Sequence, residues 1–324
     1  MHPADLLLQT IFRYDEMSYY WFGLLLGVSN VWRNGFRLGF KKTLGKILQP
    51  VNSYTRFPEY CFLGRDTQDY LQGKGASDGV KILDVGSPKC FGLYLAFHFD
   101  VEVYLTDIDP ASVEEAELLW NGIKNRARGK AFFSVQDVRA LRYSHDQFNI
   151  VYSMSVIEHV DGEAGDSESI REMIRVLKPQ GRLLVTVPVG QTYVRQDRIG
   201  FEGAARATGN RSRYFFQRIY TPSAADERII KAATHAVLRR SVTIWRKNGL
   251  LSRLYRHLGT NLRGAVGFLN PMLSAALNDD SDGLHPAPSD YGDLHSASDL
   301  YGDLVLAWQK EASEVQGGRD VAPL

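Results

Sequence analysis

The sequence predicts an α/β fold in which helices cover both faces of a doubly wound, mostly parallel sheet. Short apolar runs alternate with segments of helical period between residues 79 and 247. The first run, Val80–Val85, ends at Gly86, where the chain turns directly into a helix. The second, Val101–Thr106, ends at Asp107, 21 positions after Gly86. An acidic residue at about this distance from a glycine turn is typical of folds that bind a ribose.

The turn after the first strand predicts a site for charged groups. Asp84 lies at the tip of the strand, and Ser87 and Pro88 suit the N-cap and the first position of the next helix. The carboxylate can hold an ammonium, and the helix amides can hold a carboxylate. A zwitterionic amino acid fits this pattern, and S-adenosylmethionine ends in one. We expect Lys89 in the first helical turn to point into solvent; the alternative is an ion pair with the ligand carboxylate.

The remaining elements alternate in the same way. Asp109 and Pro110 predict the start of a helix, and a helix with a 3.6-residue period ends before the turn at Lys178–Gly181. Further strands are predicted at Phe132–Asp137, Phe148–Ser153, Leu177–Val187, Val237–Trp245 and Asp303–Trp308. Strand and helix signals in this order predict parallel pairing through helical crossovers.

Five motifs in order make residues 78–190 resemble the class I S-adenosylmethionine-dependent methyltransferases, of the type 11 kind. The motifs are Ile82–Gly86, Leu105–Pro110, Gln136–Asp137, Val156–Val160 and Leu177–Gly181. The resemblance implies a seven-strand Rossmann-like sheet whose last strand lies antiparallel beside the sixth, and S-adenosyl-L-methionine as cofactor. One position departs from the family. Pro88 stands where a second glycine usually permits close approach of the cofactor.

Motifs and resemblance together assign the cofactor contacts. The expected residues are Asp84, Gly86, Ser87, Asp107, Ile108, Asp137 and Val138. Asp84 would hold the amino-acid end of the cofactor, directly or through water, and Asp107 would accept the ribose hydroxyls. Asp137 falls where the family usually meets the adenine, and the alternative is a simple turn aspartate. The segment Tyr54–Tyr60 would close over the sulfonium or serve packing alone.

Glu158 and His159 follow the fourth strand, at the edge where open α/β sheets bind ligands. A hydroxyl acceptor must lose a proton during methyl transfer, and histidine is the natural base near neutral pH. We therefore expect His159, with Glu158 beside it, to be catalytic and the methylated atom to be oxygen. The alternative is a histidine that only shapes the pocket.

Composition excludes several other classes of protein. The formal net charge is +1, so no global field favours nucleic acid. The two cysteines make no disulfide framework, and no histidine or cysteine pair has metal-ligand spacing, so we predict no metal. No apolar run reaches the length of a membrane span. These features predict a cytoplasmic protein, with membrane association through its N-terminal helices as an alternative.

The predicted organisation has four parts. Residues 1–78 form a helical cap, 79–247 the cofactor-binding core, 248–310 a helical insertion with a mobile loop and the last strand, and 311–324 a tail. Basic and apolar residues alternate over 33–48, which predicts either a helix packed on the domain or one lying on an anionic membrane. Residues 188–222 are expected to be a long loop, followed by a helix over Pro222–Ala236.

These observations predict a methyltransferase that acts on a small-molecule or lipid-linked acceptor, with the oligomeric state left open. A methyltransferase-like scaffold without catalytic activity is the first alternative, because Pro88 narrows the first motif. An NAD-dependent oxidoreductase is the second, but Gly86–Lys89 lacks the glycine triplet that a pyrophosphate needs.

Overall fold

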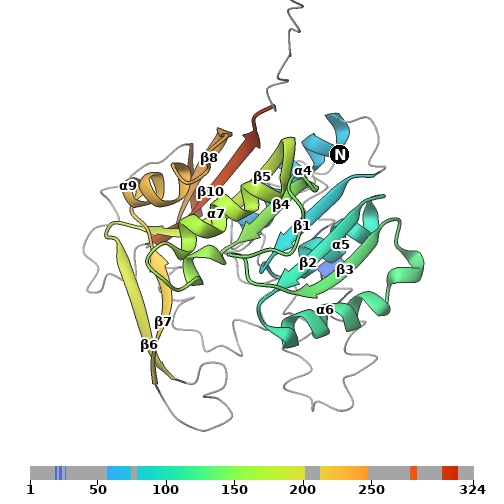
Figure 1. Cartoon of the computed structure of the whole chain (residues 1–324), viewed down its shortest axis with the longest axis horizontal. Coiled ribbons are helices and arrows are strands. Elements are labelled where there is room, and N and C mark those ends of the chain that lie inside the picture. The colour runs from blue at the N-terminus through green and yellow to red at the C-terminus, as the bar shows by residue number, and fades with distance from the viewer. Residues whose placement is uncertain are drawn as a thin grey trace, which may run out of the picture.

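The computed structural model describes residues 19, 22–23, 26, 57–73, 79–200, 212–246, 278–282 and 301–312. Within them, an eight-stranded sheet has the order β3-β2-β1-β4-β5-β10-β8-β9, and β6 and β7 form a separate two-stranded sheet. The strands of the main sheet are β1 (Lys81–Val85), β2 (Glu102–Asp107), β3 (Lys130–Val135), β4 (Phe148–Met154), β5 (Leu177–Gly190), β8 (Ala236–Arg246), β9 (Asn278–Asp282) and β10 (Tyr301–Lys310). Figure 1 shows helices on both faces of this sheet.

The helices are α4 (Phe57–Gly73), α5 (Cys90–His98), α6 (Pro110–Asn121), α7 (Gly165–Val176) and α9 (Pro222–Ala225). As predicted, α5, α6 and α7 connect strands that pair in parallel. Short helical turns are η2 (Lys124–Arg126), η3 (Ile157–His159) and η4 (Asp226–Ile230). Asp109 caps α6, because its side chain accepts a hydrogen bond from the Ala111 amide and Pro110 takes the first position.

Alternate residues of the central strands face two hydrophobic clusters. Ile82 and Ile150 belong to the cluster that includes α4 and α5, and Leu83 and Val151 belong to the cluster that includes α7. Since successive strand residues point to opposite faces, a strand covered on both sides must be apolar throughout. Asp84 is the buried polar exception in β1, and its burial requires polar partners.

The last strand of the chain lies inside the sheet. β10 pairs antiparallel with β5 on one side and with β8 on the other, whereas β1, β2, β3, β4 and β5 pair in parallel. The predicted fold class, a seven-strand sheet with an antiparallel last strand, is therefore confirmed. β9 adds a further strand at the edge beside β8.

Three predicted segments differ from the structure. The expected loop over 188–222 contains a hairpin of β6 (Val194–Gly200) and β7 (Ser212–Ile219), which stands away from the main sheet in Figure 1. The helix expected over 222–236 ends at Ile230, since β8 begins at Ala236. β9 lies in the expected mobile loop. The predicted helices over 33–48 and 248–277 lie outside the described residues.

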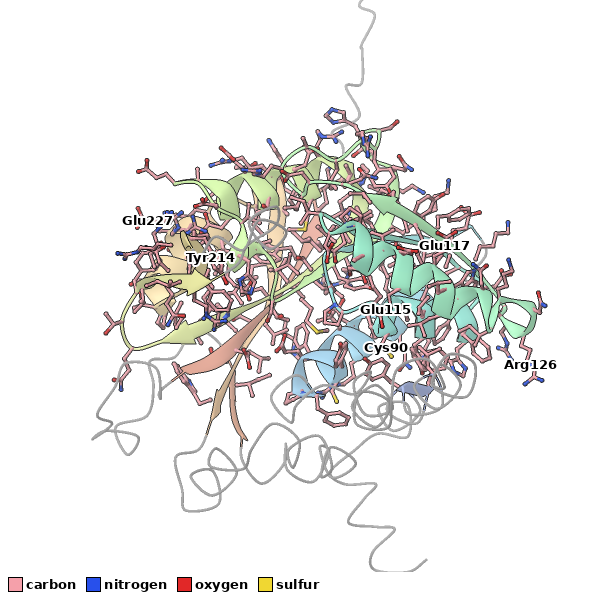
Figure 2. The ribbon with its side chains drawn as sticks, turned by 90° about the horizontal axis from the view of Figure 1, so that it is seen from below. Cys90, Glu115, Glu117, Arg126, Tyr214 and Glu227 are labelled. Carbon is pink, nitrogen blue, oxygen red and sulfur yellow. The ribbon has the colours of Figure 1, made fainter. Side chains whose placement is uncertain are left out.

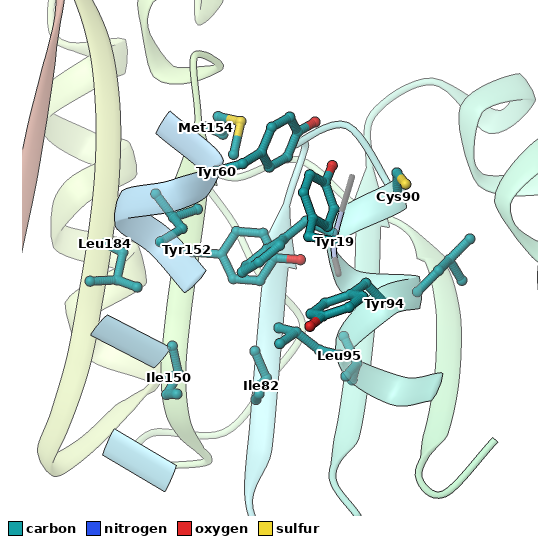
Figure 3. Close-up of a cluster of buried hydrophobic side chains, with 14 of the residues drawn as sticks. Tyr19, Tyr60, Ile82, Cys90, Tyr94, Leu95, Ile150, Tyr152, Met154 and Leu184 are labelled. Carbon is teal, nitrogen blue, oxygen red and sulfur yellow. The ribbon is translucent and has the colours of Figure 1, made fainter. Parts of the chain in front are cut away.

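Aromatic residues from the N-terminal region pack against the first cluster. Tyr19, Phe22 and Leu26 are buried, and the Tyr19 ring lies 4.6 Å from the Tyr60 ring and 5.7 Å from the Phe91 ring. Figure 3 shows Tyr19, Tyr60 and Tyr152 gathered above the apolar side chains of the central strands. Of the helices that the structure describes, none has both the length and the apolar character needed to cross a bilayer.

Candidate active site

Gly86 makes the sharp turn that ends β1. Its φ of +68° is a left-handed conformation that glycine adopts without strain, and its amide donates to the Thr106 carbonyl at 2.9 Å. A Cβ at this position would lie 2.6 Å from Val156 Cγ1. Glycine is therefore required both by the backbone conformation and by the packing of the segment after β4.

The helix after this turn begins two residues later than predicted. α5 starts at Cys90, so Pro88 is not its first residue and Ser87 is not its N-cap. Ser87 instead accepts a hydrogen bond from the Met154 amide through Oγ, at 2.9 Å, and its own amide donates to Asp84 Oδ1 at 3.0 Å. The hydroxyl thus ties the turn to β4. The predicted capping role of Ser87 is wrong because the hydroxyl has a partner across the sheet.

Asp84 is fully buried and surrounded by donors. Oδ1 accepts from the Ser87 amide and from Lys89 Nζ at 3.1 Å, and Oδ2 accepts from the Tyr152 hydroxyl at 2.8 Å. Burial raises the pKa of Asp84 to about 6, although the charge of Lys89 and these hydrogen bonds act in the opposite direction. The carboxylate therefore has protein partners for both of its oxygens.

Lys89 does not point into solvent, which corrects the sequence prediction. Its side chain is 8% exposed, and Nζ lies 3.1 Å from Asp84 Oδ1 and 3.4 Å from Asp107 Oδ2. Nζ also donates to the Thr106 carbonyl at 2.7 Å. Two acidic residues from neighbouring strands share this one cation, because the parallel pairing of β1 and β2 brings both carboxyl ends to the same edge. Nothing in the helical pattern of residues 90–98 indicated that Lys89 turns inward.

Asp107 lies partly exposed at the end of β2. Its side chain is 16% exposed, and its oxygens accept from the Asp109 amide and from Ser112 Oγ. The next residue, Ile108, is 66% exposed and presents an apolar side chain at this edge. A reachable carboxylate beside an exposed apolar side chain suits a ribose diol joined to a flat heterocycle. This part of the predicted site therefore fits an adenosyl ligand.

Asp137 is held by its own turn. Arg139 donates to it through Nε at 3.1 Å and through Nη2 at 2.6 Å, and this hydrogen bonding lowers the pKa of Asp137. Val138 is 9% exposed and belongs to the α7 cluster. The neighbouring Gln136 amide donates to the Asp107 carbonyl at 2.9 Å. The turn as a whole thus lies beside the end of β2, but the Asp137 carboxylate is already paired.

His159 lies in η3, and the hairpin strand β7 fixes its ring. Nδ1 is 2.5 Å from the Phe216 carbonyl, which can only accept, so in the neutral ring Nδ1 carries the proton and Nε2 the lone pair. Glu158 is 2% exposed, and its Oε1 lies 3.7 Å from Nε2. A carboxylate at this distance stabilises the ring once Nε2 takes a proton. Glu158 and His159, both predicted from sequence, thus place a buried carboxylate beside Nε2 of the imidazole.

A buried arginine that sequence analysis missed holds the hairpin in place. Arg218 of β7 is 1% exposed and donates to the Val160 and Gly162 carbonyls, just after His159. Its Nε lies 3.6 Å from Asp166 Oδ2, and Arg228 pairs with the same carboxylate at 2.8 Å. Burial alone would raise the pKa of Asp166, but these arginines hold that pKa below its ordinary value. The sequence did not single out Arg218 as buried, because several other arginines lie near it in the chain.

Glu59 of α4 provides a further buried carboxylate. It is fully buried and accepts from Thr186 Oγ1 at 2.5 Å and from Ser155 Oγ at 3.2 Å. These contacts fix the start of α4 over the ends of β4 and β5. Glu59 lies in the segment expected to close over the sulfonium, and Tyr60 beside it packs on Phe91 with ring centroids 6.0 Å apart. The described contacts of Glu59 and Tyr60 thus join α4 to the sheet and to α5.

Figure 2 shows the breadth of this edge from below, with α6 and its Glu115 and Glu117 on one side and Tyr214 of the hairpin on the other. Among the residues that the structure describes, no three histidine, cysteine or acidic side chains are grouped as metal ligands would be.

Comparison with known proteins assigns the same region. Residues 76–214 match a family model described as a methyltransferase domain, and this range contains every predicted site residue. Phosphoethanolamine N-methyltransferase 3 of Arabidopsis thaliana is 28% identical over 121 residues, which are 37% of this chain and 23% of that protein. The match thus spans less than a quarter of that relative.

Solved structures with a similar arrangement have low sequence identity. An S-adenosylmethionine-dependent methyltransferase from Methanosarcina mazei is 14% identical with a TM-score of 0.46, covering 76% of this chain and 97% of that one. The [4+2]-cyclase SpnF is 20% identical with a TM-score of 0.43, covering 76% and 80%. At these values neither likeness bears on activity. The family match and the strand order carry the assignment: residues 76–214 are a methyltransferase domain with the α/β fold of the class I, S-adenosylmethionine-dependent methyltransferases.

Proposed function

We propose that this chain transfers a methyl group from S-adenosyl-L-methionine to a hydroxyl of a small-molecule or lipid-linked acceptor. The cofactor of this family supplies an electrophilic methyl group on a sulfonium. The observation that carries the proposal of a general base is the 2.5 Å contact of His159 Nδ1 with the Phe216 carbonyl, which in the neutral ring places the basic lone pair on Nε2. A base is needed because a hydroxyl must lose its proton as the new bond forms.

The adenosyl part of the cofactor would be held at the end of β2. The Asp107 oxygens accept from the Asp109 amide and from Ser112 Oγ, and their remaining lone pairs would accept the ribose hydroxyls. The exposed side chain of Ile108 offers an apolar face to the adenine. Gly86 makes the turn at the end of β1 and packs against Val156, which follows β4. Asp137 contributes through the shape of its turn, since its carboxylate is bound to Arg139.

His159 and Glu158 would act on the acceptor side. His159 Nε2 takes the proton of the acceptor hydroxyl, and the buried carboxylate of Glu158 stabilises the resulting imidazolium. Arg218 keeps η3 and β7 together, so that the Phe216 carbonyl holds the ring orientation. Orientation of this kind lowers the entropic cost of reaching an in-line geometry.

The plant relative is named for an amine acceptor, phosphoethanolamine. That relative supports transfer to a small molecule, and it makes a nitrogen acceptor the main alternative to oxygen. A protonated amine also needs a base, so His159 would serve either acceptor. The position of the transferred label distinguishes the two chemistries.

The test combines binding with transfer. S-adenosylhomocysteine should bind in calorimetry, and tritium from methyl-labelled S-adenosylmethionine should enter an alkali-stable methyl ether in the aqueous or lipid fraction of a cell extract. Label on nitrogen would overturn the oxygen assignment alone. Binding without transfer into any fraction would favour the scaffold alternative, and absence of binding would reject the methyltransferase function.

The role of His159 can be tested separately once an acceptor is found. Turnover should rise with pH as the imidazole loses its proton, and His159→Ala should reduce kcat by about 10²–10⁴-fold. Glu158→Gln should move this rise to lower pH, because the imidazolium loses its nearby carboxylate. Affinity for S-adenosylhomocysteine should be unchanged in both variants. A pH-independent kcat in His159→Ala close to that of the wild type would contradict the assignment.

A further inference from the structure

The Lys89 ammonium lies where the sequence placed the ammonium of a ligand. The Asp84 carboxylate was expected to hold the amino group of the cofactor, but its Oδ1 already accepts from Lys89 Nζ at 3.1 Å. Nζ lies 2.7–3.4 Å from three oxygens, which are the Thr106 carbonyl, Asp84 Oδ1 and Asp107 Oδ2. Two carboxylates and one carbonyl are also the acceptors that the ammonium group of a ligand would need.

Solvent has almost no access to this arrangement. The side chain of Asp84 is 0% exposed and that of Lys89 is 8% exposed. The Tyr152 hydroxyl and the Ser87 amide also donate to Asp84, so both of its oxygens have protein partners. A ligand can therefore reach Asp84 only by displacing Lys89, whereas it can reach Asp107 directly.

We propose that Lys89 is a resident cation that replaces the ligand ammonium on Asp84 and so removes most of the selectivity of this site for the amino group of its ligand. Asp107 and the backbone then provide the affinity, through the adenosyl group. The inference rests on the binding of an adenosyl ligand at the β1–β2 edge, but it does not depend on methyl transfer or on the acceptor.

The exchange of one ammonium for another explains why the effect should be large. Removal of Lys89 leaves two carboxylates from adjacent strands without their shared cation, and a ligand ammonium restores it. A hydrogen bond to a charged group changes affinity by roughly tenfold or more. Lys89→Met should therefore turn the amino group of the ligand from a nearly neutral feature into a strong contributor to affinity.

The experiment compares S-adenosylhomocysteine with its des-amino analogue, which lacks only the amino group, by calorimetry on the full chain. In the wild type the two dissociation constants should agree within about threefold. In Lys89→Met the analogue should bind at least about tenfold more weakly than S-adenosylhomocysteine. Lys89→Arg, which keeps a cation, should resemble the wild type. Lys130→Met is the matched control, because the Lys130 side chain is 72% exposed in its pair with Glu102.

The outcomes separate this inference from the proposed function. A wild type that prefers S-adenosylhomocysteine by more than about thirtyfold overturns the inference, whether or not Lys89→Met folds. Equal ratios in wild type and Lys89→Met also overturn it while leaving cofactor binding intact. Binding of S-adenosylhomocysteine only after Lys89→Met supports it. Failure of every folded variant to bind either ligand rejects the cofactor assignment and the inference together.

Discussion

Asp84 shows how its surroundings determine the behaviour of a single carboxyl. Its position at a strand tip was predictable, because an aspartate that ends an apolar run is conspicuous. The inward turn of Lys89 was not predictable, since it depends on the pairing of β1 with β2 and on the late start of α5. The sequence therefore located the carboxylates of the site, but not the cation that they share.

The raised pKa of Asp84 gives a test that uses pH alone. The carboxyl has a pKa of about 6 when folded, against an ordinary value of 3.8, so folding favours its protonated form. Stability from this group is complete at low pH and is lost as the pH rises from about 4 to about 6. The difference in unfolding free energy between wild type and Asp84→Asn should decline across that window, as measured by urea denaturation.

Asp137→Asn is the control for this titration. Hydrogen bonding from Arg139 lowers the pKa of Asp137, so its stabilising contribution is present above pH 4 and is lost only below it. The difference between wild type and Asp137→Asn should stay flat between pH 4 and pH 6. A flat difference for Asp84→Asn in the same window would show that Asp84 does not titrate there.

Single elements differ in how well their pattern predicts them. β1, β4 and β5 are buried on both faces, and their continuous apolar runs predicted them as strands. The hairpin strands β6 and β7 contain arginines, an aspartate and aromatic residues. Their apolar and polar residues do not alternate strictly, because only part of each strand is buried. Arg198 lies over the Phe216 ring and Arg218 near the Phe215 ring. Cation–π contacts of this kind hold these strands without a regular apolar pattern, so the sequence carried no strand signal here.

The turn between β1 and α5 can be tested through two glycines of similar conformation. Gly86 and Gly79 have φ values of +68° and +72°, but a Cβ on Gly79 would meet nothing within 4 Å. Gly79→Ala should therefore report backbone strain alone. Gly86→Ala should lose about 1–3 kcal/mol more, because the added methyl group collides with Val156.

Denaturant unfolding of both variants measures this difference, and Gly86→Ala combined with Val156→Ala provides the control for contact. The smaller side chain at Val156 should restore part of the loss, since it vacates the space that the methyl group needs. Equal losses in Gly79→Ala and Gly86→Ala would show that Val156 does not constrain the turn.

At the scale of the whole molecule, the sheet joins distant parts of the chain. β10 lies between β5 and β8, more than a hundred residues after β5 ends in the sequence. Its apolar run at Asp303–Trp308 made it predictable as a strand. β9 was missed because Asn278–Asp282 contains no apolar residue and is added at an edge, where only backbone pairing is required.

The central place of β10 predicts that its core residues stabilise the entire domain. Trp308 is 1% exposed and belongs to the cluster on the α7 face, so Trp308→Ala should lower the free energy of unfolding by roughly 3–5 kcal/mol. Glu311, two residues beyond Gln309, is exposed, and Glu311→Ala should change stability by no more than about 0.5 kcal/mol. Because β10 pairs on both sides, far-ultraviolet circular dichroism and S-adenosylhomocysteine binding should be lost at the same urea concentration in Trp308→Ala. Loss of circular dichroism at a clearly lower concentration than loss of binding would mean that β1, β2 and β4 fold without the strands that β10 joins.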